Sequence, residues 1–229
     1  MNALKRSTTN PDLLITEYCL LTMPTHLYFI RHARSVWNDA GRWQGQADPP
    51  LGESGLAQAR RLAERLRSGP PIDHLYASDL QRASATASLV AEATGLTLTL
   101  DPIWRERRVG EWEGLTTEEI ATRYPEAWAS RLRGPLEAPG GETLAEVMQR
   151  ATQACAGLLE RHPDQSVAVV SHGGMILAAL VHLLGLGPSG FALLVGGRNT
   201  AISHVIVEDG HARLDRLNDY AHLELPLPA

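Results

Sequence analysis

The feature that most constrains the fold is a short apolar run in the second half of the chain, Val167–Val170. It contains only valine and alanine, and a strand without polar alternation is typical of a parallel sheet that is covered on both faces. Apolar residues recur at helical spacing before it, over Thr143–Leu159, and a very apolar helical segment, Met175–Leu184, follows it. A buried strand between two such helices predicts an α/β fold.

Strand and helix patterns alternate through the rest of the chain. Strand-forming runs occur at His26–Ile30, Ile72–Ala77 and Thr97–Leu100, and two later runs should pair as a hairpin around Asp209-Gly210. We expect side-chain caps at two helix starts, namely Asp79 and either Thr116 or Thr117, and a further helix begins at Thr143, where Glu142 and Glu146 favour the N-terminal end. The alternation predicts a three-layer α/β/α architecture with a mainly parallel sheet and helices on both faces.

The length of 229 residues corresponds to one large domain or two small ones. Because no linker or repeat interrupts the pattern, we expect a single catalytic domain over residues 23–229, preceded by a poorly ordered N-terminal extension, residues 1–22. Cys19 and Cys155 show no metal-ligand spacing, which favours a reducing, cytoplasmic location. The chain has no apolar run of about 20 residues, and its net charge of −5 argues against a general nucleic-acid binder.

Unusual residues follow three of the predicted strands. Arg31-His32 follows the first strand, Arg82 lies shortly after the second, and His172 follows Val167–Val170. Ligands of open α/β sheets bind beyond the carboxyl ends of the strands, and arginines beside histidines indicate an anion, because guanidinium matches phosphate or carboxylate oxygens. A metal site is disfavoured since arginines repel a cation. For each of these residues taken alone, a structural role is the main alternative to anion binding. Judged from the spacing alone, an anion-binding site and a set of structural residues are about equally supported.

A set of short motifs then occurs in a fixed order. They are RHARS (31–35), WN (37–38), WQG (43–45), SDLQRASATA (78–87), RE (105–106), GEWEG (110–114), PGGE (139–142) and VSHGG (170–174). Together they resemble the histidine phosphatase superfamily, also called the phosphoglycerate mutase-like family, and the resemblance covers the chain from Thr25 onward. It implies a phosphoglycerate mutase-like fold.

The resemblance also implies roles for individual residues. His32 would be the nucleophile that forms a phosphohistidine, and Arg31, Arg82 and His172 would hold the phosphoryl oxygens. Glu106 would act as acid and base, although from the sequence alone an ion pair with the neighbouring arginines is favoured for this residue. Three further groups are expected to contact the phosphate or the leaving group, namely Asn38, Gln44 and the backbone N–H of Gly173. No metal ion or other cofactor is implied.

Two positions depart from the family pattern. Ala33 replaces the usual glycine after the nucleophilic histidine, which matters if the backbone there needs a positive φ or a close ligand approach. Arg34 stands where an acidic residue or glutamine is common, and we expect it to affect substrate preference.

The predicted function is a metal-independent phosphatase that acts on a small phosphorylated metabolite. A cofactor-dependent phosphoglycerate mutase is the first alternative, and it is disfavoured because only residues 115–139 separate the tryptophan motif from PGGE, whereas mutases carry a longer basic insert. A regulatory or binding member without activity is the second alternative. Neither nucleic acid nor a membrane is an expected partner. The apolar segment Phe191–Val195 suits a homodimer contact and core packing equally well.

Overall fold

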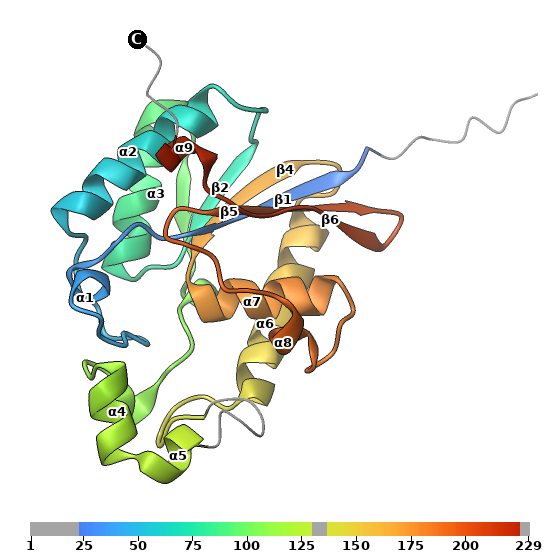
Figure 1. Ribbon diagram of the computed structural model, residues 1–229. Helices are drawn as coiled ribbons and strands as arrows, with labels where there is room; N and C mark the ends of the chain where they lie inside the picture. The colour runs from blue at the N-terminus through green and yellow to red at the C-terminus, as the bar shows by residue number, and fades with distance from the viewer. Residues whose placement is uncertain (1–22, 130–136, 225–229) are drawn as a thin grey trace, which may run out of the picture.

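The computed structural model describes residues 23–129 and 137–224. A six-stranded sheet with the order β3-β2-β4-β1-β5-β6 forms its centre (Figure 1). The strands are β1 (Thr25–Arg31), β2 (His74–Ala77), β3 (Leu98–Leu100), β4 (Ser166–Ser171), β5 (Ile202–Glu208) and β6 (His211–Asp219). The first four are mutually parallel, while β5 pairs antiparallel with β1 and with β6. The predicted mainly parallel sheet and the closing hairpin are confirmed.

Helices cover both faces of the sheet. On one face lie α2 (Glu53–Arg67) and α3 (Gln81–Thr94), and on the other lie α6 (Leu144–Arg161) and α7 (Gly173–Leu183), as Figure 1 shows. Strand β4 supplies both cores, since alternate residues pack into opposite layers. This two-sided burial explains why its sequence is continuously apolar, and it confirms the three-layer architecture.

The remaining helices are short. They are α1 (Val36–Asp39), α4 (Thr117–Arg123), α5 (Pro125–Ala129), α8 (Gly190–Leu193), α9 (Ala221–Glu224) and the 3-10 helices η2 (Pro102–Trp104) and η3 (Gly110–Trp112). Thr116, one of the two predicted candidates, caps α4, and Thr143 caps α6 at the predicted helix start; both caps form a capping box. The predicted cap at Asp79 is wrong: α3 begins after Leu80, and the Asp79 carboxylate instead pairs with the Arg105 guanidinium at 2.5 Å.

Three expectations concern the ends and surroundings of the chain. The predicted extension, residues 1–22, lies outside the described residues, so its boundary at Met23 and the single-domain organisation stay predictions. Cys155 is a buried free thiol in the described part of the chain. In the same residues, no helix combines the length and apolar character needed to cross a membrane.

Candidate active site

A cavity of about 360 Å³ opens where β1 ends and where α7 begins. The cavity lining contains most of the predicted site residues and several others. They are Arg31, His32, Asn38, Gly41, Arg42, Trp43, Gln44, Gly45, Arg82, Glu106, Arg107, Val109 and Gly174. The convergence follows from the topology, because β1, β2 and β4 are parallel neighbours and end at the same edge.

His32 lies at the base of this cavity with only 2% of its surface exposed. Its ring nitrogen Nδ1 lies 2.7 Å from the carbonyl oxygen of Ala33, so Nδ1 carries the proton and donates it, and the lone pair is left on Nε2. Burial lowers the pKa of His32 well below 6.5, and the guanidinium groups of Arg82 and Arg31 lower it further. The ring is therefore neutral at physiological pH, as a nucleophile requires.

Two buried guanidinium groups flank the ring. Arg82 is fully buried and donates from Nη1 to the carbonyl of Ala47 at 2.7 Å and from Nη2 to that of Gly45 at 2.8 Å. Arg31 donates from Nη1 to the carbonyl of Gly197 at 2.5 Å. Within the described residues, the Nε atoms of both arginines are buried and have no partner. Burial lowers the pKa of Arg82 to about 10 and also lowers that of Arg31, so Arg82 stays charged at neutral pH.

His172 lies behind His32, with ring centres 5.0 Å apart, and it is fully buried. Both of its ring nitrogens lack a hydrogen-bond partner in the described part of the chain. Burial lowers its pKa well below 6.5, followed by the charges of Arg82, His32 and Arg31. In the free protein the ring is therefore neutral, and a protonated ring would require a bound anion to stabilise it.

Glu106 sits at the N-terminus of α7. Its carboxylate accepts hydrogen bonds from the backbone N–H of Arg107 at 2.8 Å, of Gly174 at 3.1 Å and of Met175 at 3.2 Å. The expected alternative, an ion pair with adjacent arginines, is wrong: within the described residues Arg105 pairs with Asp79, and Arg107 donates from Nε to the carbonyl of Glu142. Glu106 is the one carboxylate in the cavity lining formed by the described residues.

Asn38 and Gln44 are oriented by the N-terminal cap of α1. The Oδ1 atom of Asn38 accepts from the backbone N–H of Ser35 at 3.1 Å, and the Oε1 atom of Gln44 accepts from the Ser35 hydroxyl at 2.7 Å. Because both oxygens are engaged, both amide NH₂ groups are left as donors at the cavity wall. Gly173, in contrast, lies outside the cavity lining and packs against Arg31: a Cβ at Gly173 would stand 3.7 Å from the Arg31 guanidinium carbon.

The two departures from the family pattern have clear surroundings. Ala33 is fully buried and does not have a positive φ, so this backbone does not need glycine. Its N–H donates to the Thr86 hydroxyl at 3.0 Å. Arg34 pairs with Asp39 at 2.7 Å and is absent from the cavity lining. Arg34 therefore has no direct contact with the cavity through which it could affect substrate preference.

Several lining residues were not identified from the sequence as site residues. Trp43 meets Trp112 and Trp128 edge to face, with ring centres 5.7 and 6.3 Å apart, and thereby packs the cavity wall against α5. Arg42 donates to the carbonyl of Gly114 at 2.5 Å. Arg107 also lines the cavity. The positions of the tryptophans in the sequence did not indicate this packing, because contacts between loops produce no periodic pattern.

The arrangement is that of an anion site built for phosphoryl transfer. Arg31 and Arg82 line the cavity together with the neutral imidazole of His32 and the carboxylate of Glu106, while His172 lies outside the lining with its ring centre 5.0 Å from that of His32. Within the described residues, the Nε atoms of both arginines and the ring nitrogens of His172 are buried and have no partner. Donors in a water-poor site stabilise charge that develops on a transferring phosphoryl group.

Comparisons with known proteins agree with this class. Residues 27–220 match the histidine phosphatase superfamily (branch 1). Phosphoserine phosphatase 1 of Hydrogenobacter thermophilus is 37% identical over 199 residues, which cover 86% of this chain and 93% of that protein. A metal-independent phosphoserine phosphatase of Arabidopsis thaliana is 33% identical, over 87% of this chain and 83% of that protein.

Two further matches extend the range of functions. A probable phosphoglycerate mutase of Yersinia pestis, GpmB, is 34% identical over 87% of this chain and 95% of that protein. The solved structure of a mycobacterial glucosyl-3-phosphoglycerate phosphatase with VO3 has a TM-score of 0.76 at 32% identity, over 84% of this chain and 98% of that one. The chain therefore belongs to the histidine phosphatase superfamily and is a phosphoric monoester hydrolase of that family.

Proposed function

We propose that this cavity hydrolyses small phosphate monoesters through a phosphohistidine on His32, without a metal ion. The observation that carries the proposal is the set of buried nitrogen donors of Arg31, Arg82 and His172 that have no partner among the described residues. Buried polar groups in folded proteins are nearly always paired. A bound phosphoryl group supplies the missing acceptors in one place.

The reaction proceeds in two displacements. The Nε2 lone pair of His32 attacks phosphorus, and the bond between phosphorus and the ester oxygen breaks. Glu106 donates a proton to the departing alkoxide and afterwards takes a proton from the water that attacks the phosphohistidine, which releases inorganic phosphate and restores His32. Arg31, Arg82 and His172 bind the equatorial oxygens in both steps. Asn38 and Gln44 add amide donors at the cavity wall.

The substrate we propose carries a carboxylate close to the phosphate ester. The Nε atom of Arg107 donates to the carbonyl of Glu142 at 2.8 Å, and the guanidinium lies in the field of Glu137, Glu106 and Glu142, while its terminal nitrogens form no hydrogen bond or ion pair within the described residues. They therefore remain available at the cavity wall for a planar carboxylate. Relatives named for phosphoserine and for a glucosylated 3-phosphoglycerate support this substrate class.

Phosphate release from phosphoserine, 3-phosphoglycerate and p-nitrophenyl phosphate, measured with EDTA present, tests the proposal. We expect release from all three, and activity that depends on added metal would contradict the mechanism. Arg107→Gln should raise KM about tenfold for the two carboxylates, the size of one charged hydrogen bond, and leave p-nitrophenyl phosphate unchanged. Equal effects on all substrates would exclude carboxylate recognition by Arg107.

The same assay separates the alternatives. A mutase interconverts 3- and 2-phosphoglycerate in the presence of 2,3-bisphosphoglycerate and releases little phosphate, while a regulatory member does neither. The relative named as a probable phosphoglycerate mutase makes this comparison necessary. We also propose a cytoplasmic location and a small phosphorylated metabolite as the partner. The buried free thiol of Cys155 supports the location.

A further inference from the structure

Residues 195–200 connect α8 to β5, and we call them the strap. Their sequence, VGGRNT, matches no catalytic motif. The strap nevertheless forms hydrogen bonds to Arg31, His32 and Asn38, all of which line the catalytic cavity. A segment near the C-terminus therefore contacts the site that residues near the N-terminus build.

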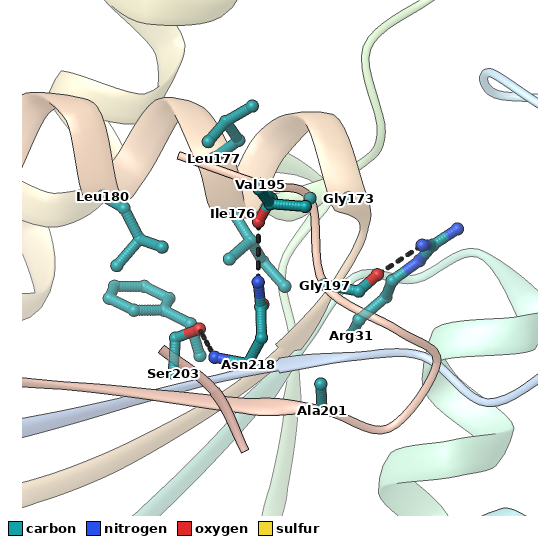
Figure 2. A pocket seen from close by; sticks show the side chains of 12 residues that line it. Arg31, Gly173, Ile176, Leu177, Leu180, Val195, Gly197, Ala201, Ser203 and Asn218 are labelled. Carbon is teal, nitrogen blue, oxygen red and sulfur yellow. Dashed lines mark hydrogen bonds between the residues drawn. The ribbon is translucent and has the colours of Figure 1, made fainter. Parts of the chain in front are cut away.

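The first of these bonds fixes the Arg31 guanidinium. Its Nη1 donates to the carbonyl oxygen of Gly197 at 2.5 Å, and this bond is drawn in Figure 2. Arg31 forms a wall between the catalytic cavity and a small, mostly apolar pocket under the strap. Because the guanidinium is planar, fixing one nitrogen sets the direction of the buried Nε atom, which has no partner within the described residues.

Asn199 forms the second connection. Its Nδ2 atom donates to the carbonyl oxygen of His32 at 2.8 Å and to the Oδ1 atom of Asn38 at 3.3 Å. The second bond helps to keep the Asn38 oxygen turned away from the cavity and its NH₂ group available there. If the Asn38 amide flipped, its oxygen would face the phosphate oxygens and repel them.

Asn218 on β6 holds the strap in place. Its Nδ2 atom donates to the carbonyl of Val195 at 2.6 Å, and its backbone N–H donates to the Ser203 hydroxyl at 3.1 Å (Figure 2). Its φ is +55°, a value that asparagine and glycine adopt more readily than other residues. A Cβ on Gly197 would lie 2.5 Å from the Oδ1 atom of Asn218, so the strap rests directly on this side chain.

We propose that Asn199 and Asn218 are positioning residues for phosphoryl transfer. Asn199 orients Asn38, and Asn218 orients Arg31 through the strap. Neither touches the phosphate. The inference rests on the proposed function, because it assumes that Arg31 and Asn38 bind the phosphoryl group.

Two variants separate positioning from general stability. Asn199→Ala removes both amide bonds, and Asn218→Gly removes the bond to Val195 while glycine keeps the positive φ without strain. Arg198→Gln is the matched control: Arg198 lies on the strap and stacks on the Tyr220 ring at 4.3 Å, and it is absent from the cavity lining. For each protein we would measure kcat, KM, the inhibition constants of orthovanadate and inorganic phosphate, and the urea midpoint.

We expect both variants to lower kcat/KM for p-nitrophenyl phosphate about tenfold, as the loss of one well-placed hydrogen bond to the transition state does. Orthovanadate, which mimics the transition state, should lose about tenfold in affinity, and phosphate about twofold or less. Arg198→Gln should match the wild type in all four constants. If Asn199 acts through Asn38, Asn199→Ala should have little further effect in an Asn38→Ala background.

A strap with a structural role alone lowers the urea midpoint but leaves the ratio of vanadate to phosphate affinity at the wild-type value. That outcome, or additive effects of Asn199→Ala and Asn38→Ala, would overturn the proposal while the wild type remains active. A wild-type protein that releases no phosphate would overturn the proposed function and this inference with it.

Discussion

Arg82→Met provides the sharpest test of the anion site. At this residue the burial of the charge destabilises the folded protein, while the hydrogen bonds of the guanidinium stabilise it. Burial lowers the pKa of Arg82 from 12.5 to about 10, and one pKa unit corresponds to about 1.4 kcal/mol, so burial disfavours the folded, charged form by roughly 3 kcal/mol. Below about pH 10 the group is charged in both the folded and the unfolded chain, so this penalty does not vary across physiological pH.

The two hydrogen bonds from Arg82 to the carbonyls of Ala47 and Gly45 act in the other direction. A bond from a charged donor contributes about 1.5–3 kcal/mol, so together they roughly offset the burial penalty. We therefore expect Arg82→Met to change the free energy of unfolding by no more than about 1.5 kcal/mol. The kcat should nevertheless fall by about 10²–10³, the usual effect of losing one preorganised donor to developing charge.

Urea unfolding and steady-state kinetics on the same preparations measure both quantities. Arg105→Met is the matched control, because Arg105 pairs with Asp79 and is absent from the cavity lining. It should keep wild-type activity. A loss of more than about 3 kcal/mol in Arg82→Met would show that the guanidinium is mainly structural. Activity within threefold of wild type would refute its role in phosphate binding.

The remaining predictions concern the acid–base residue and pH. Glu106→Gln should slow phosphohistidine formation by about 10²–10⁴ for alkyl phosphates and much less for p-nitrophenyl phosphate, whose leaving group needs no proton; equal effects would contradict the acid role. Gly174→Ala should reproduce this pattern more weakly, since its Cβ would lie 2.6 Å from the Glu106 carboxylate; rapid-quench assays of both ester types check it. Burial lowers the pKa of His222 to about 4. Below pH 6.5 the unfolded chain therefore binds a proton that the folded chain does not, and stability should fall by roughly 3 kcal/mol between pH 6.5 and pH 4. His222→Gln should flatten urea midpoints over this range, and an unchanged slope would contradict the assignment.

The site was predictable where it depends on strand order. Arg31 is the last residue of β1, His172 directly follows β4, and Arg82 lies in the first turn of α3, so a parallel sheet brings them to one edge whatever the details of packing. The burial that makes His32 neutral follows as well, since His32 directly follows β1, a strand that is covered on both faces.

The contacts of the strap and the pairing of Asp79 with Arg105 were not predicted. They join segments that are far apart in the sequence and share no repeating pattern. The strap reaches Arg31 and Asn38 only because β5 and β6 add to the sheet beside β1, and the sequence gives no register for that pairing. Asp79 has the residue type of a helix cap, but the Arg105 guanidinium competes for its carboxylate and takes it. Local propensity predicts what a side chain can do, while tertiary partners decide which option is used.

The proposed mechanism requires one cavity to hold a nucleophile and a dianion together, and the charges of the site are consistent with both. If His32 and His172 were protonated they would help to bind phosphate, but His32 would then lack the lone pair that attacks it. Burial removes this conflict by keeping both rings neutral in the free protein. The positive charge then comes from guanidinium groups, and that of Arg82 remains protonated at neutral pH even after its pKa is lowered. The phosphate in turn favours a proton on His172, which has no other acceptor among the described residues. The substrate therefore completes the electrostatic balance of its own site, which is why removing one arginine should affect turnover far more than folding.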